Sequence, residues 1–421
     1  MSAIRPVLAV LLLCLLIGRA HAQAGPVFAP GGPDAAAYGQ ALGYPTAPPS
    51  PRLPQRFMVG NYSHFDRLLR SHRIARPAAA SPLGRAPQQL ALTYGYRGVT
   101  YALPDYLNRN PATGLLIARG DTTLFEHYQY ARTDHDRFLS QSMAKTVTAM
   151  LLGIALSEGA IRSIDQPAAD YVPGLAGTEF GRTSIRDLLH MASGIAFRET
   201  YDGTDDAAAL NRMLASGIDP ARAVARFNTR AVPAGTRFHY AGIQTEVLGL
   251  VIANATHTSL ADYLDSRIWQ PMGAEADATW VIDPTGHELA FCCISATLRD
   301  WARFALLLAH DGAWNGRQII PRDWVIASTT VAAPYLAPGA VAPFYGYGNQ
   351  VWLLPGPRRQ FALLGIHGQT IFVDPAAQLV LVQTAVRVKA TADASAGELR
   401  AVWRALVQRA VAEPGPGAHE R

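Results

Sequence analysis

The stretch Ser142-Met143-Ala144-Lys145 sets a hydroxyl and an amine three residues apart, so on a helix the two side chains share one face. The chain has 37 lysines and arginines, of which only Lys145 and Lys389 are lysines. Arginine stays protonated at any working pH, whereas a buried lysine can lose its charge and accept a proton. The stretch therefore indicates a Ser-Lys nucleophile. The alternative is a chance match in which Ser142 only caps the helix and Lys145 is solvated.

Apolar residues around Lys145 recur at three- and four-residue steps, which indicates a largely buried helix ending near Gly159. Ser142 would lie in its first turn, among unpaired backbone N–H groups at the positive end of the helix dipole. That position favours a developing oxyanion. The apolar positions are Met143, Val147, Met150, Leu151, Ile154 and Ala155.

A second candidate residue is Tyr240, which lies 98 residues after the serine. Residues 233–236 predict a turn, and a buried helix follows through residues 247–251. A tyrosine at such a junction can present its hydroxyl to a site, and a cationic lysine nearby would make the phenol ionise more readily. Tyr240 is therefore a candidate second proton carrier; ordinary helix packing is the alternative for a lone tyrosine.

A third candidate stretch, Leu-Leu-Gly-Ile-His-Gly-Gln-Thr at residues 363–370, lies on or just before a late strand. Its closely spaced glycines, Gly365 and Gly368, let a backbone N–H approach a bound carbonyl without side-chain obstruction. Such an N–H would complete an oxyanion hole.

Strand patterns occur at both ends of the chain and helix patterns in the middle. The first two strands form a hairpin at Gly120-Asp121, Ser184 begins a capped helix, and residues 399–411 predict a closing helix. This order predicts an α/β (α+β) fold, with one mainly antiparallel sheet flanked by helices and an inserted, mainly helical subdomain. The predicted strands cover residues 114–118, 123–130, 347–354, 370–373 and 379–387.

The composition is that of a globular protein with a large core, because 49% of the 421 residues are hydrophobic and 16% are charged. The net charge of +5 is not gathered in a basic run, so no nucleic-acid partner is expected. His287-Glu288 lacks the second histidine of a zinc helix, and there is no P-loop, dinucleotide or G-x-S-x-G motif. We therefore expect no metal and no cofactor.

The N-terminus has the pattern of a cleaved secretory signal, with Arg5, an apolar run and Ala20-His21-Ala22 before Gln23. We expect a periplasmic or secreted protein, with membrane contact only if this segment is not cleaved. The predicted organisation is a signal peptide at 1–22, an extended Pro/Ala-rich arm with little chemistry at 23–90, a main domain at 91–412 and a polar tail at 413–421.

Without the signal, Cys292 and Cys293 are the only cysteines, which excludes a disulfide framework. Adjacent cysteines bridge only with strain, so two reduced, buried, small apolar residues are expected.

The three candidate stretches, in this order, resemble the serine hydrolases related to class C β-lactamases, DD-peptidases and family VIII carboxylesterases. Within that group the chain is most similar to the 6-aminohexanoate-dimer (nylon-oligomer) hydrolases. Ser142-Met143-Ala144-Lys145 matches the S-x-x-K motif, Tyr240-Ala241-Gly242 falls at the Tyr-x-Asn motif, and residues 297–304 resemble a helix of the family. The resemblance covers about residues 94–411 and implies a β-lactamase/transpeptidase-like fold.

Two positions depart from the family pattern. Gly242 stands where β-lactamases and penicillin-binding proteins carry asparagine, and Leu363 stands where they carry the lysine of Lys-Thr-Gly. That lysine helps to hold an anionic substrate carboxylate, so its absence argues against efficient β-lactam chemistry. The resemblance therefore favours amides or esters as substrates.

The same resemblance implies the remaining site residues. It places the backbone oxyanion donors at Ser142 and Ile366, with His367 and Gln369 near the substrate. Residues 197–201 resemble the loop over the cleft of the aminohexanoate hydrolases, where Tyr201 would bond the scissile amide. A surface-loop tyrosine is the alternative for Tyr201.

We therefore expect a serine hydrolase that cleaves a small amide or ester through an acyl-enzyme, with Ser142, Lys145 and Tyr240 as the catalytic set. Two alternatives remain open. One is a catalytically weak, peptidoglycan-associated binding or regulatory protein, and the other is a true β-lactamase. A binder has no need of a lysine in an arginine-using chain, so the sequence favours the enzyme.

Overall fold

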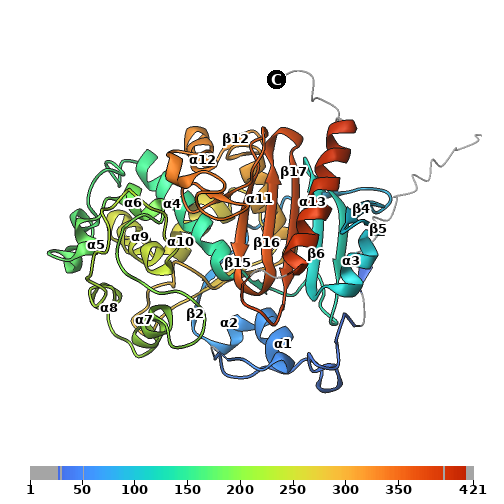
Figure 1. Ribbon diagram of the computed structural model, residues 1–421, viewed down its shortest axis with the longest axis horizontal. Helices are drawn as coiled ribbons and strands as arrows, with labels where there is room; N and C mark the ends of the chain where they lie inside the picture. Colours follow the sequence, from blue (N-terminus) through green and yellow to red (C-terminus); the bar gives the residue numbers. More distant parts are fainter. Residues whose placement is uncertain (1–26, 29–30, 51, 392–393, 414–421) are drawn as a thin grey trace, which may run out of the picture.

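The computed structural model describes residues 27–28, 31–50, 52–391 and 394–413. The expected signal peptide and nearly all of the expected polar tail lie outside the described residues. Within them, a large sheet with a helix on each face stands beside a helical lobe (Figure 1).

The large sheet is built from both ends of the chain, as the sequence predicts. Its strand order is β1-β7-β6-β17-β16-β15-β14-β13, with β3 also paired to β7. The two N-terminal strands β1 and β3 run parallel to β7, and the other neighbours pair antiparallel. The strands are β1 (Val27–Phe28), β3 (Gly84–Arg85), β6 (Ala112–Arg119), β7 (Thr122–Tyr128), β13 (Gly346–Tyr347), β14 (Trp352–Leu353), β15 (Phe361–Gly365), β16 (Gln369–Asp374) and β17 (Leu379–Ala385).

Both faces of this sheet are apolar, because each face is covered by a helix and successive side chains of a strand point to opposite faces. On β6, Leu116 and Ala118 join the core that contains α11 (Leu298–Ala309). Leu115 and Ile117, on the opposite face, join the core of α13 (Ala394–Ala412). The uninterrupted apolar run of β6 is therefore the pattern of a strand buried on both faces.

The helical lobe lies between β7 and β15 in the sequence and to the left of the sheet in Figure 1. Its centre is the contact between α4 (Ala144–Ser157) and α9 (Gly242–Thr256), both almost wholly buried. The first of these helices carries Lys145, and the second follows Tyr240. The smaller helices around them are α5 (Glu179–Arg182), α6 (Ile185–Leu189), α7 (Asp206–Ala215), α8 (Pro220–Val224) and α10 (Leu260–Leu264).

A second, four-stranded sheet joins the N-terminal segment to the middle of the chain. Its order is β2-β9-β10-β8, and its last strand leads directly into the turn that carries Ser142. The sequence did not predict this sheet, because strands of two to four residues are too short to show a periodicity. The strands are β2 (Ser71–Ile74), β8 (Phe138–Leu139), β9 (Ala278–Val281) and β10 (Ile294–Ala296).

The described part of the N-terminal arm packs onto the main domain and is not simply extended. It contributes β1, β2 and β3 and the short helices α1 (Met58–Ser63) and α2 (Phe65–Leu68). Its aromatic and apolar side chains share a buried cluster with main-domain residues, which explains why it folds despite its prolines. The arm members of the cluster are Tyr38, Tyr44, Met58, Val59 and Tyr62.

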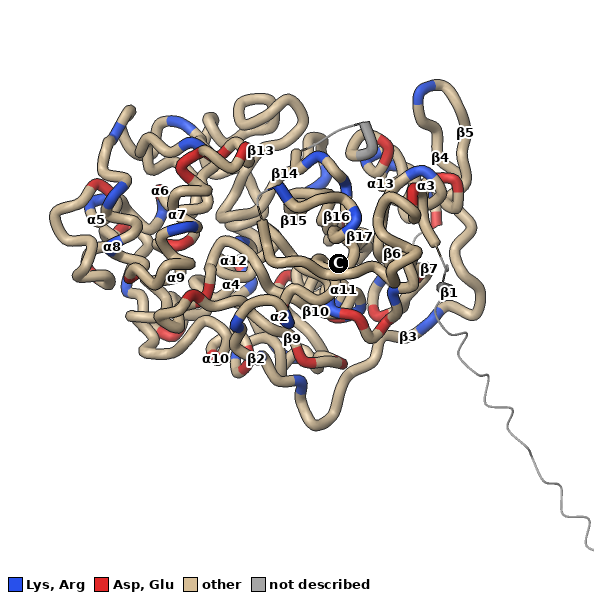
Figure 2. The backbone as a smooth tube through the Cα atoms, turned by 90° about the horizontal axis from the view of Figure 1, so that it is seen from below, with Lys and Arg blue, Asp and Glu red and all other residues tan. Residues whose placement is uncertain are grey.

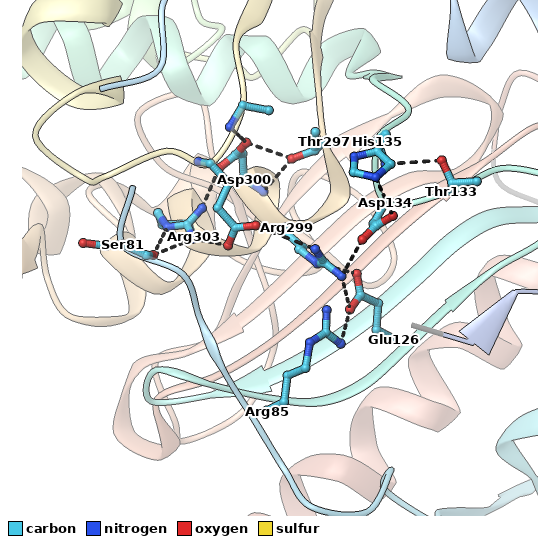
Figure 3. A network of polar contacts seen from close by, with 12 residues as sticks. Ser81, Arg85, Glu126, Thr133, Asp134, His135, Thr297, Arg299, Asp300 and Arg303 are labelled. Carbon is cyan, nitrogen blue, oxygen red and sulfur yellow. Dashed lines mark hydrogen bonds and ion pairs between the residues drawn. The ribbon is translucent and has the colours of Figure 1, made fainter. Parts of the chain in front are cut away.

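A buried polar network fixes the later part of the arm to α11 (Figure 3). Arg303 donates to the Ser81 carbonyl at 2.6 Å and pairs with Asp300. Arg299, on the same helix, bonds Glu126 at 2.8 Å, and Arg85 of the arm bonds the other oxygen of that carboxylate at 2.6 Å. Elsewhere, charges of both signs are interspersed along the described chain (Figure 2).

The predicted elements agree with the structure where the pattern is long. The hairpin turn at Gly120-Asp121, the helix after Ser142, the capped helix start at Ser184 and the closing helix are all present. The prediction of a single strand at 347–354 is wrong. This segment forms the hairpin of β13 and β14, because Gln350 takes a left-handed conformation, with φ at 58°, that interrupts the extended chain.

Candidate active site

Ser142 lies in a single 3-10 turn, Gln141–Met143, that runs directly into α4. One turn later Lys145 is fully buried, with 2% of its surface exposed. Its Nζ donates to Ser142 Oγ at 2.9 Å and to the Phe291 carbonyl at 3.0 Å. The helical spacing thus brings the serine and the amine into direct contact, and the Phe291 carbonyl fixes the amine from a second side.

Burial changes the protonation of Lys145. Loss of solvation lowers the pKa of its amine to about 8, against the opposing charges of Glu199 and Glu246. Its Nζ also lies 5.0 Å from the ring centre of Tyr240 and 5.6 Å from that of Phe291. The amine can therefore lose its proton within the range in which most enzymes work, as the rarity of lysine in this chain suggested.

Tyr240 lies just before α9, and its hydroxyl is close enough to Ser142 for the serine to influence the pKa of the phenol. Its ring stacks on Trp352 at 5.5 Å between centres. Burial raises the pKa of this phenol, the carboxylate of Glu199 adds to the rise, and the interaction with Ser142 opposes it. The expectation that a nearby lysine would make Tyr240 ionise more readily is wrong, because burial and the charge of Glu199 raise the pKa of the phenol. Tyr240 is a neutral hydroxyl that can donate a proton.

Glu199 is a polar residue of this site that the sequence did not single out. Its Oε1 accepts from the Tyr201 hydroxyl at 2.8 Å, and its Oε2 accepts from the backbone N–H of Gly242. A Cβ at Gly242 would lie 3.2 Å from Oε2, so the glycine gives the carboxylate room. The carboxylate thus lies against Gly242, the position that the sequence resemblance matches to the family's asparagine.

Tyr201 lies beside the expected catalytic residues. Its pKa is raised by burial and then by the neighbouring Tyr240 and Glu199. Its backbone is left-handed, with φ at 61°, and its N–H is held by Asp205 at 2.7 Å. A surface pocket of about 340 Å³ borders the same loop and is lined in part by Phe197 and His239.

The end of β15 packs directly against the nucleophile turn. A Cβ on Gly365 would lie 2.6 Å from the Ser140 carbonyl oxygen, so only glycine allows this approach. Ile366 and His367 follow, half-buried, and His367 is left-handed with φ at 62°. Its Nδ1 donates to the Arg387 carbonyl at 2.6 Å, which fixes the ring.

The side chain of Gln369 is buried and hydrogen-bonded to the backbone next to this loop. It is 1% exposed, and its amide nitrogen donates to the carbonyls of Ala385 at 2.7 Å and Ile366 at 3.3 Å. Its amide oxygen accepts from Ala385 N–H at 3.1 Å. The structure therefore places its side chain where it supports Ile366 and does not present it beside Ser142.

The segment Ala290-Phe291, whose Phe291 carbonyl accepts a hydrogen bond from Lys145, is itself hydrogen-bonded to two helices. Thr148 of α4 donates to the Ala290 carbonyl at 2.8 Å, and the Ala290 N–H donates to Glu246 of α9 at 3.0 Å. Burial raises the pKa of Glu246 to about 8. Backbone carbonyl contacts have no sequence signature, which is why the role of Phe291 was not foreseen.

Cys292 and Cys293, directly after Phe291, form a disulfide. The expectation of a reduced pair is wrong on this point. That expectation was based on the strain of bridging adjacent cysteines, whereas here Cys293 adopts a left-handed backbone, with φ at 73°, next to its bonded neighbour.

Neither a metal site nor a membrane-spanning helix occurs among the described residues. No cluster of three or more His, Cys, Asp or Glu side chains there could hold a metal ion. In the same part of the chain, no helix has both the length and the apolar character needed to cross a membrane.

The protein is a serine hydrolase with the β-lactamase/transpeptidase-like fold. The chain belongs to the beta-lactamase family, whose model matches residues 104–402.

Known proteins similar to this chain carry related names. The 6-aminohexanoate-dimer hydrolase of Paenarthrobacter ureafaciens is 29% identical over 295 residues, which cover 67% of this chain and 75% of that enzyme. The solved structure of a proposed 6-aminohexanoate-dimer hydrolase from Bacillus anthracis is similar with a TM-score of 0.77 and 24% identity, covering 88% of this chain and 100% of that one. A penicillin-binding protein homologue from Caulobacter crescentus has a TM-score of 0.55 and 17% identity over 71% of this chain and 93% of its own. The two structural matches show the fold.

Proposed function

We propose that this serine hydrolase cleaves a small linear amide or ester through an acyl-enzyme on Ser142. The observation that carries the proposal is the 2.9 Å contact between Lys145 Nζ and Ser142 Oγ, made by an amine whose pKa is lowered to about 8. A serine hydroxyl is a weak nucleophile until a neighbouring base takes its proton. The neutral amine of Lys145 is that base.

The first step forms the Ser142 Oγ–carbon bond while the proton of Oγ passes to Lys145 Nζ. The Phe291 carbonyl, 3.0 Å from Nζ, keeps the amine aimed at the serine. The substrate carbonyl oxygen becomes an oxyanion, which the backbone N–H groups of Ser142 and Ile366 would bind. Removal of one such donor commonly slows catalysis by about 10²–10³-fold.

The second step breaks the bond to the leaving group. The neutral hydroxyl of Tyr240 donates its proton to the departing amine or alkoxide and regains one from Lys145. Water then attacks the acyl-enzyme by the same route in reverse, which regenerates the Ser142 hydroxyl. The hydroxyl of Tyr201, whose proton is donated to Glu199, would accept a hydrogen bond from the scissile amide N–H.

Substrate choice follows from what surrounds the serine. Leu363 supplies no cation for a substrate carboxylate, and the Glu199 carboxylate adds negative charge beside Gly242. Both features disfavour an anionic group close to the scissile bond, such as the carboxylate of a β-lactam. The likeness to 6-aminohexanoate-dimer hydrolase supports linear amides of amino acids, and the family supports short esters.

The proposal is tested by turnover of three probes: the linear 6-aminohexanoate dimer, p-nitrophenyl butyrate and a chromogenic cephalosporin. We expect hydrolysis of the amide or the ester, poor turnover of the cephalosporin, and no turnover by Ser142→Ala. Efficient cephalosporin turnover by wild type would make the protein a β-lactamase, and activity in Ser142→Ala would remove the serine from the mechanism.

We also propose a periplasmic or secreted location, on the signal pattern at residues 1–22. The disulfide Cys292–Cys293 supports it, because disulfides persist in oxidising compartments. N-terminal sequencing of the protein from its host would then begin at Gln23.

A further inference from the structure

The N-terminal arm reaches the turn that carries Ser142. Helix α1 is buried along its whole length and contacts β8, the strand just before that turn. Its residue Tyr62 is 7% exposed. The hydroxyl of Tyr62 accepts a hydrogen bond from Gln141 Nε2 at 3.0 Å, and its ring meets the His367 ring edge-on at 5.5 Å between centres.

These two contacts are made to the sequence neighbours of the two proposed oxyanion donors. Gln141 directly precedes Ser142, and His367 directly follows Ile366. Both residues are left-handed, with φ at 46° and 62°, a conformation that non-glycine residues keep only where their surroundings hold it. One side chain from the arm therefore contacts the neighbours of both proposed oxyanion donors.

We propose that Tyr62 is a positioning residue that keeps the two oxyanion N–H donors in register, so that the arm is a working part of the active site. The inference rests on the proposed function, in which Ser142 and Ile366 bind the oxyanion. Tyr62 touches no reacting atom and acts only through Gln141 and His367. The oxyanion forms only as the reaction proceeds to the transition state. Misplaced N–H donors therefore lower kcat and leave KM unchanged.

The arm also offers a matched control. Tyr44 belongs to the same buried cluster as Tyr62, but its buried hydroxyl has no hydrogen-bond partner among the described residues. Tyr62→Phe and Tyr44→Phe each remove one hydroxyl and keep the ring. A purely structural role of the cluster would affect the two variants alike.

The test compares kcat, KM and the rate of Ser142 phosphonylation by a fluorophosphonate in wild type, Tyr62→Phe and Tyr44→Phe. We expect Tyr62→Phe to lower kcat and the phosphonylation rate by about tenfold at unchanged KM, since small misplacements of catalytic groups have large effects. Tyr44→Phe should match wild type. Unchanged kcat in Tyr62→Phe, an equal loss in both variants, or a change in KM alone overturns the inference.

A second variant removes the other partner of the hydrogen bond between Gln141 and Tyr62. Gln141→Met removes the donor to Tyr62, and the double variant with Tyr62→Phe should lose no more activity than either single variant. Additive losses contradict the inference, and Gln141→Met alone decides the question if Tyr62→Phe does not fold. If wild type is not phosphonylated at Ser142, the proposed function itself fails; if it is phosphonylated and Tyr62→Phe reacts equally fast, only the role of Tyr62 fails.

Discussion

At the scale of single residues, the proposed chemistry depends on the charge of Lys145. Burial lowers its pKa to about 8, and the free amine is the form that accepts a proton. We therefore predict that kcat/KM for ester hydrolysis rises with pH, with a midpoint near 8. An activity that falls as pH rises through this range would contradict the role of Lys145 as base.

Glu199 should shift that midpoint. Its negative charge raises the pKa of Lys145, so Glu199→Gln is predicted to move the midpoint to lower pH. Glu158→Gln is the control, because Glu158 forms an exposed ion pair with Arg267. The pH dependence of kcat/KM is measured for both variants. An unchanged midpoint in Glu199→Gln would show that the Glu199 charge does not influence the pKa of Lys145.

Sequence reasoning predicted part of the candidate site. Ser142, Lys145 and Tyr240 were predicted as the catalytic set from their residue types and spacing, and the structure places Lys145 Nζ 2.9 Å from Ser142 Oγ and 5.0 Å from the ring centre of Tyr240. Glu199 and Phe291 were not, since they act through a loop carboxylate and a backbone carbonyl that only tertiary structure places. The phenol's pKa was misjudged because the sequence shows the charge nearby and not the depth of burial.

At the scale of elements, the approach of β15 to the nucleophile turn defines the proposed oxyanion hole. A methyl group at Gly365 would lie 2.6 Å from Ser140 O and 2.9 Å from Gln141 Cβ, so Gly365→Ala must push the two segments apart. We predict a fall in kcat of about a hundredfold, as expected for a displacement near 1 Å. Steady-state kinetics measures it.

The control for this substitution is Gly95→Ala on β4 (Thr93–Tyr96), where an added Cβ meets nothing within 4 Å. It should keep full activity. Wild-type kcat in Gly365→Ala would mean that the close approach of β15 is not needed for catalysis.

The elements also show where sequence patterns stop being informative. The hairpin of β6 and β7 and the helix α4 were predictable because each shows several periods of apolar residues. The two-residue strands β8, β13 and β14 show none. Their pairing depends on distant segments, so it is decided by tertiary structure.

At the scale of the whole molecule, the buried ion pair of α11 secures the arm and the domain together. Arg303 and Asp300 are both fully buried, and Asp300 also accepts from the N–H groups of Glu275 at 2.8 Å and Ala276 at 3.0 Å. Arg303→Met leaves the carboxylate without its counter-charge. We predict a loss of about 3–5 kcal/mol in the free energy of unfolding, measured by urea denaturation.

Arg267→Met provides the comparison, because Arg267 pairs with Glu158 at the surface, with side chains 43% and 38% exposed. Such pairs contribute about 0–1 kcal/mol. Equal losses in the two variants would show that the buried network does not secure the arm.

The central claim is that Ser142 is a nucleophile activated by Lys145. The most direct measurement is the intact mass of wild type, Ser142→Ala and Lys145→Ala after treatment with a fluorophosphonate. A single adduct on wild type that is absent from both variants is the predicted result. No adduct on wild type, or an adduct that persists in Ser142→Ala, would contradict the assignment of the nucleophile.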